Sequence, residues 1–224
     1  MTRFLVITLF LITVGCSTNT RQQVLSVEQL PYYSEATFTP EWFETEDGVP
    51  DDYHQISSFS LVNQSGETLT EKDVEGKIYV ADFFFTSCPG ICPKMTTNMQ
   101  LVQEAFINDE DVLILSHSVT PEYDSVYVLK TYAELNGVVD EKWHLLTGDR
   151  NEIYDLGRNQ YFVEEDLGLD KDPDDFIHTE NFVLIDKERR IRGIYNGLNK
   201  AAVNQLIADI KVLKKSENVY LKHS

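Results

Sequence analysis

The chain has 224 residues, of which 42% are hydrophobic and 11% aromatic, and its formal net charge is -18. This length and composition predict one globular domain with a packed core and a tail, and they exclude a wholly disordered chain. A chain this acidic repels phosphate backbones at long range, which excludes nucleic acid as a partner. We interpret the acidity chiefly as a solubility property of the surface.

The N-terminus has the layout of an export signal. One positively charged residue, Arg3, precedes an apolar run over residues 4–14. A membrane-spanning helix needs about 20 apolar residues, so this run is too short to cross a bilayer. We therefore predict a signal peptide over residues 1–15 and an exported protein.

The junction that ends the apolar run, Gly15 followed by Cys16, resembles a bacterial lipobox. The resemblance implies that Cys16 is acylated and becomes the mature N-terminus. Thr13 departs from the aliphatic residue that is usual three positions before the cysteine. We expect a lipoprotein anchored to the membrane and facing the periplasm or the cell exterior, and a simple signal peptide without lipidation is the alternative.

Residues 16–53 are polar, contain three prolines and lack sustained periodicity, which is typical of a tether. Residues 54–224 then form the predicted domain. Several aromatic side chains of the tether indicate that part of it packs back on the domain: Tyr32, Tyr33, Phe38, Trp42 and Phe43.

Apolar periodicity predicts the elements of the domain. Residues 78–85 form a nearly continuous apolar run, as expected of a central strand buried on both faces. In chain order we expect a hairpin of residues 59–62 and 68–70, the central strand 78–85, a helix after Pro93 that buries Met95, Met99, Val102 and Phe106, a strand 112–115, a helix 123–135 ended by Gly137, a strand 143–146, a hairpin of residues 182–186 and 191–195, and a last helix 201–213. This order predicts an α/β, thioredoxin-like fold with a central mixed sheet flanked by helices and an N-terminal hairpin.

Three cysteines minus a lipidated Cys16 leave one pair, Cys88 and Cys92, outside the cytosol. The pair lies where the central strand gives way to a helix. Unpaired backbone N–H groups and the dipole at a helix start favour thiolate over thiol. A separation of four residues brings both sulfurs to one side, close enough to bridge each other or to clamp a metal ion. Redox chemistry and metal binding are equally open on this evidence.

The spacing between the two cysteines bears on this choice. Dithiol oxidoreductases of this fold usually carry two residues between the cysteines, whereas this chain carries three, a spacing common in metal-binding variants. A purely structural disulfide is a further interpretation for an exported protein.

A third candidate ligand is His178, which precedes the predicted strand 182–186. We expect this strand beside the central one, which puts the imidazole near the helix entrance. Two thiolates and one imidazole suit Cu(I), which accepts roughly trigonal coordination, whereas zinc prefers a fourth ligand. We therefore predict a copper site formed by Cys88, Cys92 and His178, with Cu(I) as the first candidate oxidation state and Cu(II) as the second.

Residues 84–93, Phe-Phe-Thr-Ser-Cys-Pro-Gly-Ile-Cys-Pro, resemble the Sco/SenC family, as do Ile-His-Thr at 177–179 and Leu-Ile-Asp at 184–186. The resemblance covers roughly residues 57–213. It implies a thioredoxin-like fold and a copper ion held by Cys88, Cys92 and His178.

The resemblance also implies a function. Members of the family assist assembly of the binuclear copper centre of cytochrome c oxidase, so the chain is expected to be a copper metallochaperone without substrate turnover. Its expected partners are the copper-bearing oxidase subunit, a copper donor and a thiol reductant. Two alternatives stay open: a thiol-disulfide reductase that acts on the acceptor's copper-binding cysteines through Cys88, and a copper or redox sensor with no delivery role.

Five features need separate interpretation. Gly90 stands where the family's cysteine loop often has an acidic residue, and Thr120 stands where the family often has aspartate before the proline. Asp82 interrupts the central apolar strand, where a carboxylate is costly unless it is paired or protonated, and two interpretations stay open for it: proton transfer to a thiol and structural pairing. We interpret His117 as a structural histidine near a strand end, and the acidic stretch 166–175 as a solvated loop.

Overall fold

The computed structural model describes residues 29–43, 48–163, 177 and 179–220, with side chains up to residue 216. The predicted signal peptide 1–15, Cys16, His178 and the acidic stretch 166–175 lie outside the described residues. Among the described residues, no helix is long and apolar enough to cross a membrane.

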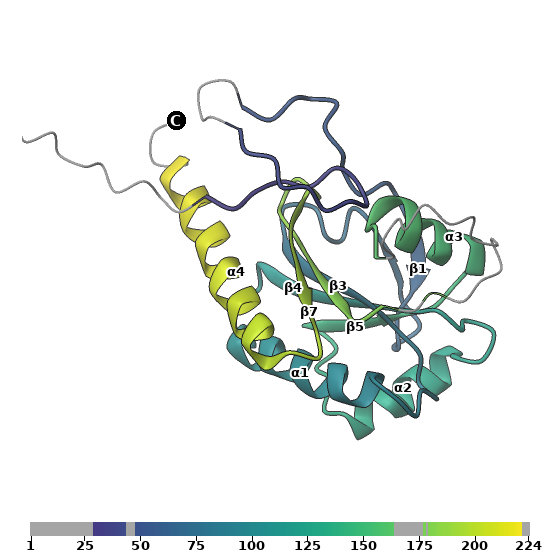
Figure 1. Ribbon diagram of the computed structural model, residues 1–224. Helices are drawn as coiled ribbons and strands as arrows, with labels where there is room; N and C mark the ends of the chain where they lie inside the picture. Colours follow the sequence, from purple (N-terminus) through teal and green to yellow (C-terminus); the bar gives the residue numbers. More distant parts are fainter. Residues whose placement is uncertain (1–28, 44–47, 164–176, 178, 221–224) are drawn as a thin grey trace, which may run out of the picture.

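A mixed sheet of five strands, in the order β5-β4-β3-β6-β7, forms the centre of the domain (Figure 1). The central strand β3 (Ile78–Phe84) pairs in parallel with β4 (Val112–Ser118), which pairs in parallel with β5 (Trp143–Leu146). On its other side, β3 pairs antiparallel with β6 (Asn181–Ile185), and β6 pairs antiparallel with β7 (Ile191–Asn196). This topology confirms the predicted thioredoxin-like arrangement. All seven residues of β3 are buried, as its continuous apolar sequence predicts.

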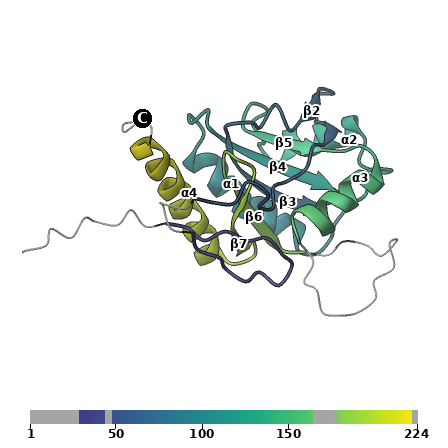
Figure 2. The same cartoon turned by 90° about the horizontal axis from the view of Figure 1, so that it is seen from above.

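Helices α1 (Cys92–Ala105), α2 (Val126–Leu135) and α4 (Lys200–Tyr220) contribute to one of the two hydrophobic clusters. The predicted apolar positions of α1, including Met95 and Met99, are fully or almost fully buried there. Figure 2 shows α1 and α4 on the same side of the sheet. The face of the helix that the sequence predicts to be buried is therefore the one that packs on the sheet.

A second hydrophobic cluster covers the other face of the sheet. It includes residues of α3 (Arg150–Asp155), of the π-helix η1 (Leu156–Gln160) that continues it, and of the predicted hairpin, β1 (Ser60–Val62) and β2 (Thr68–Thr70). The buried amide of Gln64 in the hairpin turn joins this hairpin to β5. It donates to the Trp143 carbonyl at 2.8 Å and accepts from Leu145 N at 2.7 Å, which satisfies part of the free edge of β5.

Part of the predicted tether packs on the domain, as its aromatic residues indicate. Tyr32, Phe43 and Tyr53 form edge-to-face ring contacts with centroids 5.2 to 5.9 Å apart. Trp42 is not part of this packing and is 63% exposed. The guanidinium of Arg192 in β7 fixes the segment, because it lies 3.7 Å from the centroid of the Tyr32 ring and donates to two backbone carbonyls of the segment.

Several boundaries differ from the predictions. Helix α2 begins at Val126 and not at residue 123, because the Ser125 side chain accepts from Val128 N and the residues before it form a turn. Strand β4 extends to Ser118, and α4 runs from Lys200 to Tyr220. The short helix α3 was not predicted; its N-cap is Asp149, whose side chain accepts from Glu152 N at 3.0 Å.

Candidate metal centre

The Cys88 thiol lies at the start of α1, in the loop that follows β3. The N-cap residue Ile91 supplies no side-chain hydrogen bond to the helix, and Pro93 occupies the first turn. The backbone N–H groups of Gly90, Ile91 and Cys92 are near enough to the Cys88 sulfur to lower the pKa of its thiol. The Cys88 thiol therefore lies near unpaired N–H groups at a helix start that no N-cap side chain satisfies.

This arrangement makes the two thiols unequal. Partial burial opposes ionisation of Cys88, but hydrogen bonds from the Cys92 thiol and from the backbone outweigh it, so that the pKa of Cys88 is lowered. Cys92 is 5% exposed, and burial together with its hydrogen bond to Cys88 raises the pKa of its thiol, while a backbone hydrogen bond at Phe85 acts in the opposite direction. Both cysteines are free thiols.

The predicted proximity of the pair is therefore confirmed. The thiols of Cys88 and Cys92 lie near enough for each to shift the pKa of the other, with Cys88 half-buried and Cys92 buried. Two neighbouring sulfurs, one of them in a thiol with a lowered pKa, can close a disulfide or bind one soft metal ion. Among the residues that the structure describes, no group of three or more His, Cys, Asp and Glu side chains could hold a metal ion.

Asp82 lies on the side of β3 that faces α1. Its carboxylate accepts from Ser116 Oγ, and Ser116 Oγ accepts from the indole N–H of Trp143 at 2.7 Å. Burial raises the pKa of Asp82 to about 7, and the hydrogen bond from Ser116 only partly offsets this. A buried carboxylate must be paired or protonated to be tolerated. Asp82 is hydrogen-bonded by Ser116, and its raised pKa leaves the carboxyl largely protonated below neutral pH.

Contacts between α1 and α2 support the first turn of α1. Thr96 Oγ1 donates to the Cys92 carbonyl at 2.9 Å and lies 2.7 Å from the Tyr132 hydroxyl. The Tyr132 ring in turn lies 5.5 Å from that of Phe84, measured between centroids. Thr96 and Tyr132 give no signal in the sequence, because no local pattern reveals a contact that depends on how two helices pack.

His117 belongs to the opposite face of the sheet. Its ring stacks on Phe83 with centroids 4.8 Å apart, and its Nδ1 lies 3.3 Å from the Asp82 carbonyl. Burial lowers the pKa of His117 to about 4, so the imidazole is neutral at physiological pH. This buried position agrees with the interpretation of His117 as a structural residue, and its Nε2 has no hydrogen-bond partner among the described residues.

The residues next to the third predicted ligand, His178, are described although His178 is not. Ile177 is 3% exposed, and a side chain added at Gly157 of η1 would meet both Ile177 and Phe83 of β3. Thr179 Oγ1 accepts from Asn181 N, where β6 begins. Because β6 runs antiparallel to β3, residues 177 and 179 lie at the end of the sheet where β3 leads into the cysteine loop.

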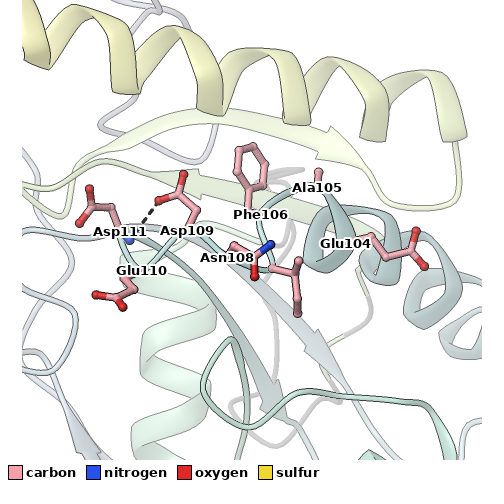
Figure 3. A pocket seen from close by; sticks show the side chains of 8 residues that line it. Glu104, Ala105, Phe106, Asn108, Asp109, Glu110 and Asp111 are labelled. Carbon is pink, nitrogen blue, oxygen red and sulfur yellow. Dashed lines mark hydrogen bonds between the residues drawn. The ribbon is translucent and has the colours of Figure 1, made fainter.

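The cavity shown in Figure 3 is separate from the thiol pair. It has a volume of about 460 Å³ and is lined by residues 104–111, at the C-terminal end of α1. Cys92 starts this helix, whose 14 residues span about 20 Å. Asp109 in the cavity wall forms an ion pair with Lys214, so the acidic lining is partly neutralised by the protein itself.

Fold and thiol pair together define the class of protein: a thioredoxin-like domain that carries two neighbouring free thiols where its central strand leads into the following helix. Comparison with known proteins gives the family. The SCO1/SenC family model matches residues 48–215, and the chain belongs to this family.

Three solved structures illustrate the relationship. BsSco, described as a member of the Sco family of cytochrome c oxidase assembly proteins with a disulfide switch, is 30% identical, with a TM-score of 0.61 over 72% of this chain and 94% of that chain. A SCO1/SenC family lipoprotein from Bacillus anthracis is 31% identical, with a TM-score of 0.62 over 72% and 95%. ScoI of Bradyrhizobium japonicum, solved with copper bound, is 28% identical, with a TM-score of 0.55 over 70% and 98%.

Proposed function

We propose that this chain is a copper metallochaperone that holds one Cu(I) through Cys88, Cys92 and His178 and passes it to the copper-bearing subunit of cytochrome c oxidase. The observation that carries the proposal is a pair of free thiols at the open N-terminus of α1, near enough for each to shift the pKa of the other, with the pKa of Cys88 lowered. Soft thiolates prefer Cu(I), and transfer by ligand exchange requires a site that solvent and an acceptor reach. Cys88 is the partly exposed ligand of the pair.

ScoI of Bradyrhizobium japonicum, which was solved with copper bound, supports copper as the metal in this proposal. BsSco, a member of a family of cytochrome c oxidase assembly proteins, supports the oxidase as the acceptor. The burial of Ile177 beside Gly157 and the position of Thr179 before β6 support His178 as the third ligand, because both neighbours lie at the end of the sheet that carries the cysteine loop. When bound, the ion would be held by the two sulfurs and the imidazole. The other contributions of the chain are to lower the pKa of Cys88 and to keep Cys92 buried from solvent.

Titration of the reduced protein with Cu(I) in competition with a chromogenic chelator tests the proposal. We expect one equivalent to bind, with two sulfurs and one nitrogen counted by X-ray absorption. Cys88→Ser and Cys92→Ser should abolish tight binding, and His178→Ala should weaken it. His117→Phe is the matched control, because His117 is buried on the other face of the sheet and should leave the affinity unchanged. Stoichiometric zinc, or full copper binding by either serine variant, would contradict the proposal.

A thiol-disulfide reductase is the second candidate function, favoured by the unequal thiols. Cys88 thiolate would attack an acceptor disulfide, releasing one acceptor thiolate and forming a mixed disulfide. Cys92, after losing its proton, would then displace the second acceptor thiolate and leave a Cys88–Cys92 disulfide. His178→Ala separates the two functions in cells that carry the oxidase. A reductase keeps full oxidase maturation at limiting copper in this variant, whereas a copper carrier loses it.

Membrane attachment belongs to the same proposal. We infer that the mature chain begins at an acylated Cys16 and that the domain works on the outer side of the membrane, with a copper donor and a thiol reductant as further partners. The lipoprotein relative from Bacillus anthracis supports this inference. Intact mass of the protein from membranes should show the lipid, and Cys16→Ser should release the protein into the soluble fraction. A mature chain that starts elsewhere without lipid would refute it.

A further inference from the structure

Asp124 has no role in the chemistry described so far, yet its carboxylate is 1% exposed and collects four hydrogen bonds. It lies in the turn between β4 and α2. Ser118 Oγ donates to it at 2.6 Å and Thr120 Oγ1 at 3.1 Å. Both the backbone N–H and the hydroxyl of Thr86 also donate to it, one to each oxygen. A buried carboxylate that is fully hydrogen-bonded in this way holds its donors rigidly.

Thr86 is the important donor, because it lies in the loop between β3 and α1, two residues before Cys88. Two backbone hydrogen bonds also fix this loop: Val119 N donates to the Phe84 carbonyl at 2.9 Å, and Cys88 N donates to the Phe85 carbonyl at 3.3 Å. The side chain of Asp124 is thus the link that fastens the middle of the cysteine loop to the neighbouring β4–α2 turn.

We propose that Asp124 is the positioning residue of the thiol pair: by holding Thr86, it keeps the Cys88 loop in the conformation that brings both sulfurs together. The part of this proposal that concerns copper rests on the proposed function, and the part that concerns the two thiols does not. Cys88 engages either a soft metal ion or the sulfur of Cys92. Asp124 acts on Cys88 through Thr86 and touches neither the ion nor a sulfur. Its effect is mechanical, since loss of its hydrogen bonds widens the range of Cys88 positions and lowers the effective concentration of one sulfur at the other.

The central variant is Asp124→Asn, which keeps the size of the side chain. Only one of its two terminal atoms accepts hydrogen bonds, so its amide group faces at least one of the former donors. Thr86→Val removes the hydroxyl that donates to Asp124, whereas Thr86→Ser keeps a hydroxyl at this position. Ser125→Ala is the matched control, because it removes the N-cap of α2 next to Asp124 without touching Thr86.

Two equilibria are measured on reduced, full-length protein. The first is Cu(I) affinity against a chelator. The second is metal-free: protein dithiol plus oxidised glutathione gives protein disulfide plus two reduced glutathiones. For Asp124→Asn and Thr86→Val we expect about a tenfold loss of copper affinity, the lower end of the range for residues that orient ligands. We expect the constant for disulfide closure to fall about tenfold as well, which corresponds to about 30 mV.

Thr86→Ser should behave as wild type in both equilibria, and Ser125→Ala should lose stability without changing either constant. The double variant of Asp124→Asn and Thr86→Val should lose little more than each single variant, because both break the same link. If both constants are unchanged in Asp124→Asn and Thr86→Val while circular dichroism shows folded protein, the proposal is wrong. If wild type fails to bind copper but the disulfide constant falls in both variants, the copper function fails and the positioning role stands.

Discussion

The ionisation of Asp82 gives a stability prediction that the structure makes quantitative. The carboxyl is 4% exposed, and burial raises its pKa from 3.8 to about 7. Between these two values the folded protein keeps a proton that the unfolded chain has released. The folded state therefore binds more protons than the unfolded state in this window, so the free energy of unfolding falls as the pH rises from about 4 to about 7, and then levels off.

The size of this effect follows from the same interval. About three pH units at about 1.4 kcal/mol each give an upper limit of about 4 kcal/mol. Asp82→Asn keeps the shape of the side chain and an oxygen for Ser116 Oγ, but it has no proton to lose. At pH 8 the reduced, metal-free variant should be more stable than wild type by up to about 4 kcal/mol, and at pH 4 the two should agree within about 0.5 kcal/mol.

Denaturant unfolding of both proteins at several pH values measures this difference. Taking the difference cancels other titrating groups, such as Asp186, whose pKa burial raises to about 6. A second readout is the fluorescence of Trp143, whose indole N–H donates to Ser116 Oγ next to the carboxyl. Because Trp42 is the other of the two tryptophans, the titration uses a Trp42→Phe background. A stability difference that is constant from pH 4 to pH 8 would refute the reasoning, since it would mean that Asp82 does not titrate in this range.

Three further predictions concern other parts of the domain. Arg192→Ala removes the buried ion pair with Asp186, 3.1 Å long, and the hydrogen bonds that hold the N-terminal segment. The free energy of unfolding in urea should fall by about 3 kcal/mol, and protease should cleave this segment more readily. Gly193→Ala should cost about 1–3 kcal/mol, because the added carbon would lie 2.7 Å from ring carbons of Tyr195. At neutral pH iodoacetamide should label Cys88 at least about ten times faster than Cys92, since Cys88 is partly exposed with a lowered pKa and Cys92 is buried with a raised one.

Each of these predictions has a control. Arg192→Lys keeps the charge but loses the multiple donors of the guanidinium, so it should recover only part of the stability. Gly90→Ala should be nearly neutral for stability, because an added carbon there meets only the Cys88 sulfur, at 4.0 Å. Labelling after unfolding in urea should make the two cysteines equally reactive. Equal reactivity in the folded protein, or a stable Gly193→Ala, would contradict the described packing.

The sequence alone determined the elements whose signals are local. The continuous apolar run of β3 and the spacing of Met95 and Met99 in α1 reflect burial on both faces of a strand and on one face of a helix, so strand, helix and the cysteine pair between them were all predictable. The turn residues of the hairpin also gave its two strands. Helix α3 with its π-helical continuation was not predictable, because its short segment has no sustained period and its stability comes from packing on the sheet.

Only the tertiary structure decided how the site is supported. Asp82 was visible in the sequence as an anomaly, but its hydrogen bond to Ser116 depends on the register of β3 against β4. Asp124 gave no signal at all, since an aspartate in a polar turn is unremarkable until Thr86, 38 residues away, is found on its carboxylate. Residue types and local spacing follow from short-range chemistry, whereas hydrogen bonds between distant segments follow from how the sheet and helices pack. For this reason the sequence offered the candidate ligands but not the proposed positioning residue Asp124.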